Sequence, residues 1–283
     1  MAATPAAGNR PRTFVIAGFG YTGVRVGARL EALGTVVGLT RKVRAPEFAA
    51  PYDVIYLVPP PAQGLTDPRL ERFLDALPAT PGRVVYLSTS GVYGDAGGAS
   101  VTEDTPPAPS TDRARRRLAA ETALRAWCEP RGVEWVILRV TAIYGPGRLP
   151  LEGLKLREPA LAESEAGPGN RIHVEDLADV CVAALLQPQG RNRIYNVSDG
   201  NHTTNTAFLG LIAKFAGLPP PPQLPLSELK AHKTDVALSF LGQSRRVDTT
   251  RLRRELGFRP RYPSVESGIR ASPWRVFWTV TVP

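Results

Sequence analysis

The sequence predicts an α/β fold of the Rossmann type, in which a doubly wound parallel sheet carries a smaller C-terminal lobe on its substrate side. Short apolar runs alternate with segments of helical periodicity, as in a parallel sheet that helices cover on both faces. The first apolar run ends in a glycine-rich turn that opens a helix. The 283 residues, 43% of them hydrophobic, are sufficient for the core of such a domain.

The alternation predicts each element in turn. Strands are expected at residues 13–18, 35–41, 52–58, 83–90, 133–140 and 193–198. Helices are expected at residues 24–33, 68–77, 113–130, 174–186, 204–217, 226–241 and 249–256. Right-handed crossovers between successive strands place the strands in one sheet.

The regular alternation stops after Gly145, and this predicts the division into domains. Residues 146–170 are rich in proline, glycine and charge. Residues 1–11 are small and polar, and we expect a disordered leader there. We assign residues 12–145 and 171–200 to a dinucleotide-binding domain, and 146–170 and 201–283 to the smaller substrate-side lobe.

The composition narrows the class of partner. Lys and Arg exceed Asp and Glu by 35 to 26, which favours an anionic ligand. The basic residues cluster only at 113–117 and 251–254, with no aromatic platform beside either, so nucleic-acid binding is the least favoured hypothesis. Cys128 and Cys181 form neither a disulfide framework nor a metal-ligand spacing. With no apolar run of the ~18 residues that a membrane span needs, we expect a cytoplasmic protein without a metal site.

The hexapeptide Gly18-Phe19-Gly20-Tyr21-Thr22-Gly23 is a G-x-G-x-x-G directly after a strand and before a helix. In this context Gly18 permits the tight turn, Gly20 lets the backbone approach a diphosphate, and Gly23 lets the helix pack on the strand. The helix N-terminus adds N–H groups and a positive dipole. We therefore predict that these six residues bind a nicotinamide dinucleotide.

The segment Leu39-Thr40-Arg41-Lys42 bears on the choice of cofactor. An NAD site normally has a carboxylate at the end of the second strand, whereas this chain has two cations. We expect the 2′-phosphate of NADP to contact Thr40 and Arg41. If these cations are ordinary surface charges, NAD remains open. Further cofactor contacts are expected at the ends of the third and fourth strands, at Leu57, Val58, Pro59, Ser88 and Thr89.

Together these motifs resemble the extended short-chain dehydrogenase/reductases, the family of NAD-dependent sugar epimerases and dehydratases. The resemblance covers the chain from about Phe14 to Gly268 and implies a polar, sugar-nucleotide-like substrate and a homodimer. The motifs, in order, are GFGYTG (18–23), STSGVYGD (88–95), EDTP (103–106), LAAE (118–121), ILRVTAIYGPG (137–147), RIHVEDLA (171–178), YNVSDG (195–200) and RRELGFRP (253–260).

The catalytic pair of the resembled family is absent. A Tyr-x-x-x-Lys normally opens the helix after the fourth strand, and counting back from LAAE places Arg113 at the tyrosine and Arg117 at the lysine. A guanidinium cannot act as a general base, although Arg113 can clamp an anionic substrate and Arg117 can donate to the cofactor ribose. Helical spacing puts both on the inward stripe, where they face either the pocket or the surface, and leaves Arg115 and Arg116 at the surface.

Other residues must then supply the chemistry. The resemblance places Thr89 at the reacting oxygen, and Tyr93 and Tyr144 are candidates for the proton carrier, each with packing as the alternative. Substrate contacts are expected from Arg113, Arg148, Arg171 and His173; for His173 the alternative is a structural role in the loop that covers the site. The sequence therefore predicts an NADP(H)-preferring, epimerase- or dehydratase-like oxidoreductase of an atypical subgroup. The alternative is a catalytically reduced NADP(H)-binding sensor or regulator.

Overall fold

Six parallel strands form one sheet at the centre of the protein, in the order β10-β6-β4-β3-β1-β2. The computed structural model describes residues 12–40, 51–241 and 243–272. The predicted leader and Arg41 lie outside these residues. The strands are β1 (Arg12–Ala17), β2 (Gly34–Leu39), β3 (Tyr52–Tyr56), β4 (Arg83–Thr89), β6 (Glu134–Val140) and β10 (Arg193–Val197). The predicted Rossmann-type sheet is confirmed.

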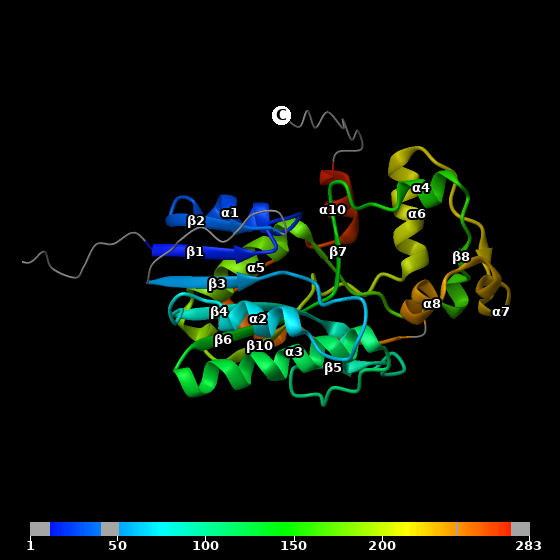
Figure 1. Ribbon diagram of the computed structural model, residues 1–283. Helices are drawn as coiled ribbons and strands as arrows, with labels where there is room; N and C mark the ends of the chain where they lie inside the picture. Colours follow the sequence, from blue (N-terminus) through cyan, green and yellow to red (C-terminus); the bar gives the residue numbers. More distant parts are fainter. Residues whose placement is uncertain (1–11, 41–50, 242, 273–283) are drawn as a thin grey trace, which may run out of the picture.

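Helices cover both faces of this sheet (Figure 1). On one face α1 (Gly23–Leu30), α5 (Val174–Leu186) and α9 (Thr250–Leu256) pack in one apolar cluster with the strands. On the other face α2 (Pro68–Asp75) and α3 (Asp112–Cys128) pack in a second cluster. Because both faces are buried, the strands need the nearly continuous apolar sequence from which they were predicted.

The remaining helices gather beyond the carboxyl ends of the strands, on the right of Figure 1. Here α6 (Asn205–Ala216) packs beside α10 (Val265–Ala271) and α4 (Leu151–Lys155) around a separate apolar cluster. The sequence assigned α9 to this lobe, whereas its Leu252 and Leu256 belong to the core of the sheet. None of the helices in the described part of the chain combines the length and apolarity that a membrane span requires.

The single helix expected at 226–241 is wrong. The chain forms α7 (Leu226–Leu229), the 3-10 turn η5 (Lys230–His232) and α8 (Asp235–Leu241). The backbone of Lys233 is extended, with φ −128° and ψ 148°, and its ammonium pairs with Glu158 at 2.9 Å. Leu229 on the other side of the break is fully buried. Tertiary contacts on both sides of the break thus override the helical periodicity.

Three pairs of very short parallel strands lie outside the six-stranded sheet. The pattern did not predict them, because strands of two or three residues leave no periodicity to detect. They are β5 (Ser100–Val101) with β12 (Arg246–Val247), β7 (Ala142–Tyr144) with β9 (Arg171–His173), and β8 (Ala160–Leu161) with β11 (Gln223–Leu224). Further 3-10 turns are η1 (Ser90–Tyr93), η2 (Glu129–Arg131), η3 (Glu163–Glu165) and η4 (Pro188–Gly190).

Candidate nucleotide-binding site

The glycine-rich turn lies where the order of the sheet reverses. Strand β1 pairs with β2 on one side and with β3 on the other, so a crevice opens beyond its carboxyl end. Gly18 turns the chain there with φ +89°, and the N–H groups of Gly18 and Phe19 both donate to Leu39 O at 3.0 Å. The turn is therefore fastened to the end of β2.

Each glycine of the turn has a distinct steric role. A Cβ on Gly18 would lie 3.0 Å from the backbone of Leu57 and Val58, and one on Gly23 would lie 2.6 Å from Gly18 O. A Cβ on Gly20 would meet no atom within 4 Å. No side chain caps the N-terminus of α1 at Thr22, which leaves helix amides for a ligand. The turn thus has the open backbone approach that a diphosphate requires.

The ring of Phe19 fills the space between the turn and its neighbours. A Cβ on Gly38 of β2 would lie 2.5 Å from this ring, and one on Gly27 of α1 would lie 2.8 Å from it. Both positions therefore need glycine to accommodate the ring. The side chain of Phe19 fixes the turn between the sheet and α1.

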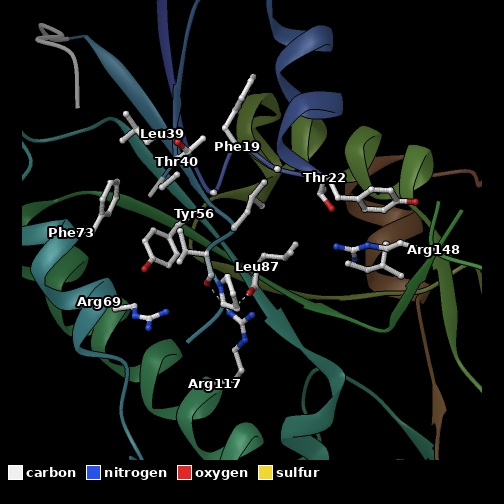
Figure 2. Close-up of a pocket in the computed structure, with 18 residues that line it drawn as sticks. Phe19, Thr22, Leu39, Thr40, Tyr56, Arg69, Phe73, Leu87, Arg117 and Arg148 are labelled. Carbon is white, nitrogen blue, oxygen red and sulfur yellow. Dashed lines mark hydrogen bonds between the residues drawn. The ribbon is translucent and has the colours of Figure 1, made fainter. Parts of the chain in front are cut away.

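A cavity of about 790 Å³ opens at this turn and extends over the ends of β3 and β4 (Figure 2). That volume suits a nucleotide-sized ligand. Eleven of the residues singled out from the sequence line it, namely Gly18, Phe19, Gly20, Tyr21, Thr22, Thr40, Leu57, Val58, Pro59, Arg117 and Arg148. The predicted site residues outside this lining are Gly23, Ser88, Thr89, Tyr93, Arg113, Tyr144, Arg171 and His173.

Arginines supply the charge of the cavity. Arg69, Arg117 and Arg148 line it, and no described lining residue carries a carboxylate. In Figure 2 Thr22 and Arg148 lie on one side, while Tyr56 and Arg69 lie on the other. The sequence analysis missed Tyr56, Arg69 and Phe73 because they lie on β3 and α2 without a motif of their own. The other lining residues that it did not single out as contacts are Ala17, Leu39, Leu87 and Ile143.

Arg117 faces the cavity from α3. Its Nη1 donates to Leu87 O at 2.8 Å and to Tyr86 Oη at 3.0 Å, and it lies 3.4 Å from Val58 O. Burial raises the pKa of Tyr86 to about 12, although the neighbouring guanidinium of Arg117 acts to lower it. Arg117 therefore places a fixed positive charge at the carboxyl ends of β3 and β4.

The surface position expected for Arg116 is wrong. This side chain is buried, and its Nη1 donates to Gly64 O at 2.7 Å, because the connection from β3 to α2 folds back against α3. Arg115 does lie at the surface, where it pairs with Asp112 at 2.7 Å. Arg113 is half-buried, and burial followed by the charges of Arg116 and Arg117 lowers its pKa. Two of the four arginines at the start of α3, Arg113 and Arg116, are thus partly or fully buried.

The tyrosines and the threonine proposed for catalysis are absent from the cavity lining. The Tyr93 hydroxyl is buried and donates to Asn196 Oδ1 at 2.7 Å. The Tyr144 hydroxyl is buried and has no hydrogen-bond partner among the described residues, and burial raises its pKa. Thr89 Oγ1 accepts a hydrogen bond from Gly91 N at 3.1 Å. Both tyrosines are thus buried, and their catalytic role stays a prediction.

His173 and Arg171 connect the sheet to the lobe. His173 Nδ1 accepts from Glu175 N at 3.3 Å and so caps α5, while its ring lies 4.0 Å from that of Tyr262. Burial lowers the pKa of His173 to about 4. Arg171 is buried, with Nη1 donating to Thr203 O at 2.7 Å and Nη2 to Asn205 Oδ1 at 2.9 Å. Both side chains stabilise the junction in this structure.

Comparison with known proteins agrees with the Rossmann-type fold. The model of the NAD dependent epimerase/dehydratase family matches residues 69–198. Protein YeeZ of Escherichia coli K12 is 31% identical over 181 residues, covering 64% of this chain and 59% of the relative. A dTDP-glucose 4,6-dehydratase of Streptomyces niveus is 27% identical over 208 residues, covering 70% and 59%. The chain spans about three fifths of the length of these curated relatives.

Solved structures extend the match over most of the chain. A functionally unknown conserved protein from Silicibacter pomeroyi is 29% identical with a TM-score of 0.78, over 92% of this chain and 97% of that one. Human epimerase family protein SDR39U1, solved with NADPH, shares the fold at 18% identity and a TM-score of 0.72, over 92% and 98%. The chain therefore resembles the NAD-dependent epimerase/dehydratase family over residues 69–198 and shares the fold of these solved structures.

Proposed function

We propose that this protein binds NADP(H) in the cavity and acts as an epimerase- or dehydratase-like oxidoreductase on an anionic substrate, with sugar nucleotides as the first class to test. The observation that carries the proposal is the open backbone at Gly20, which faces a cavity lined by three arginines and no described carboxylate. Backbone amides and cations together suit an anionic dinucleotide. Solved proteins of this fold contain NADPH or NAD, which supports a nicotinamide dinucleotide as the ligand.

The preference for NADP rests on the end of β2. Leu39 and Thr40 line the cavity there, where an NAD site would present a carboxylate to the ribose hydroxyls. Calorimetry of the ligand-free protein with NADPH, NADP and NADH tests the preference. We expect NADPH to bind on the order of tenfold more tightly than NADH. Equal affinities would contradict the preference, and no binding of any of the three would remove the function.

For the substrate we propose Arg113 as the anion contact and Thr89 as the donor to the reacting oxygen, with Arg117 at the cofactor ribose. We propose that Arg171 and His173 position the lobe, because Arg171 donates to Thr203 O and Asn205 Oδ1 and His173 Nδ1 caps α5. A panel of sugar nucleotides and carbonyl compounds, followed through the absorbance of the reduced cofactor, tests the activity. A homodimer is part of this proposal, and sedimentation analysis tests it.

A second candidate is a cofactor-binding sensor without hydride chemistry. Burial of Tyr93 and Tyr144 favours it, because neither residue lines the cavity. The double variant Arg113→Tyr/Arg117→Lys restores the family's usual pair. Turnover by this variant, where the parent binds NADPH without turnover, would support the sensor. Turnover by the parent would eliminate it.

A further inference from the structure

The loop after β7 packs directly against the glycine turn. Gly145 has φ +141°, and a Cβ at this position would lie 3.1 Å from both Tyr21 Oη and His173 Nε2. Gly147 also has a positive φ, and Arg148 N donates to Gly145 O at 3.0 Å to close the loop. The contact with Tyr21 therefore leaves little space for a side chain at Gly145. It holds the start of the loop in place and delivers Arg148 to the mouth of the turn.

Arg148 lies across the ring of Tyr21, with Cζ 4.0 Å from the ring centroid. Arg25 also lies over this ring, at 4.4 Å, but its guanidinium is already bound to Glu175 at 2.7 Å and to Tyr21 O at 2.6 Å. Arg148 is exposed, and no carboxylate pairs with it within the described part of the chain. A cation–π contact at an exposed position is weak, so Arg148 can exchange the ring for a stronger anionic partner.

The turn itself carries no cation, since residues 18–23 contain only glycine, phenylalanine, tyrosine and threonine. Arg148 lines the same cavity on the side of Thr22, while Arg69 and Arg117 approach it from α2 and α3 (Figure 2). We infer that Arg148 binds the diphosphate of the cofactor and closes over the glycine turn. This inference rests on the proposed nucleotide binding and gives Arg148 a different ligand from the substrate suggested by the sequence.

Binding of three nucleotides distinguishes a contact with the diphosphate from a contact with the rest of the cofactor. NADPH and 2′-phospho-ADP-ribose both contain the diphosphate, whereas 2′,5′-ADP has only single phosphates. We expect Arg148→Ala to weaken calorimetric binding of the first two on the order of tenfold or more, as for the loss of a charge-assisted hydrogen bond. Binding of 2′,5′-ADP should weaken much less. Arg148→Lys should retain part of the affinity, because it keeps the charge and loses the planar fork.

Arg259→Ala is the matched control, because Arg259 is exposed outside the cavity and its loss removes the same charge. It should bind all three nucleotides like the parent. Unchanged binding of NADPH by Arg148→Ala would overturn the inference, and so would an equal loss for all three nucleotides. A parent protein that binds none of them would instead refute the proposed function, and with it this role for Arg148.

Discussion

Glu121 and Arg139 form an ion pair in the interior of the protein, with Oε2 and Nη2 2.8 Å apart and both side chains 4% exposed. Glu121 lies on α3 and Arg139 on β6. The hydroxyl of Ser88 on β4 donates to the same carboxylate, and the guanidinium lies 4.9 Å from the ring centroid of Tyr93. These residues belong to three separate motifs, STSGVYGD, LAAE and ILRVTAIYGPG. Parts of these three motifs thus form one buried network between β4, α3 and β6.

Breaking this pair should strongly destabilise the fold. Glu121→Ala leaves the Arg139 guanidinium buried without its anion, and we expect the free energy of unfolding to fall by about 3 to 5 kcal/mol. Urea unfolding measures the change. Glu129→Ala, which removes an exposed partner of Arg125 at the end of the same helix, should change stability by less than about 1 kcal/mol. Similar losses in the two variants would contradict this role.

Gly20→Val should separate ligand binding from folding. The added side chain starts in space with no atom within 4 Å of its Cβ, so thermal unfolding should stay close to that of the parent. It occupies the place where a diphosphate approaches the backbone, and we expect NADPH affinity to fall on the order of tenfold or more. Gly18→Ala is the contrast, since φ +89° and the contacts with Leu57 and Val58 make it destabilising. Parent-like NADPH binding by Gly20→Val would refute this geometry.

Arg117→Met should destabilise the ends of β3 and β4. The substitution removes the hydrogen bonds to Leu87 O and Tyr86 Oη, and we expect a loss of about 1 to 3 kcal/mol in the free energy of unfolding. Arg115→Met removes the same charge from the exposed side of the helix and should cost less than about 1 kcal/mol. If the two variants unfold alike in urea, Arg117 does not anchor these strands.

His173 should make the fold sensitive to acid. Burial, with the nearby charges of Arg25 and Arg261, lowers its pKa from 6.5 to about 4 and outweighs the opposing effect of Glu175. Between these values the unfolded chain binds a proton that the folded protein does not, so stability decreases as pH falls. The contribution of His173 is complete above pH ~6.5 and is lost towards pH ~4, by about 2 to 3 kcal/mol in total.

The variant His173→Asn tests whether His173 causes the acid sensitivity. Asparagine does not titrate in this range and can still accept the hydrogen bond from Glu175 N at the start of α5. The variant should be less stable at neutral pH through the loss of ring packing against Tyr262. The stability difference between parent and variant should narrow as pH falls from 7 to 4. A difference that stays constant over this range would assign the acid sensitivity to other groups.

Local sequence was sufficient where neighbouring residues impose the structure. The turn at residues 18–23 could be predicted because tight bending and close backbone approach are constraints that adjacent glycines satisfy. The six main strands could be predicted because burial on both faces demands apolar runs. Gly20 and Thr22 could be predicted to line the cavity because they belong to this glycine turn. Phe73 could not, because it lies on α2 outside any motif.

Contacts between distant segments were decided by the tertiary structure. Helical spacing placed Arg116 at the surface, but the folded connection brings Gly64 to it across 52 residues. Glu121 likewise pairs with Arg139 because the fold packs α3 against β6. Arg148 lies over Tyr21 because the fold brings the loop after β7 to the glycine turn. Hydrophobic periodicity predicts which face of a helix or strand is buried, but it does not predict which residues pack against that face. The glycine turn therefore followed from the sequence, while the arginine contacts around it depended on the packing of the fold.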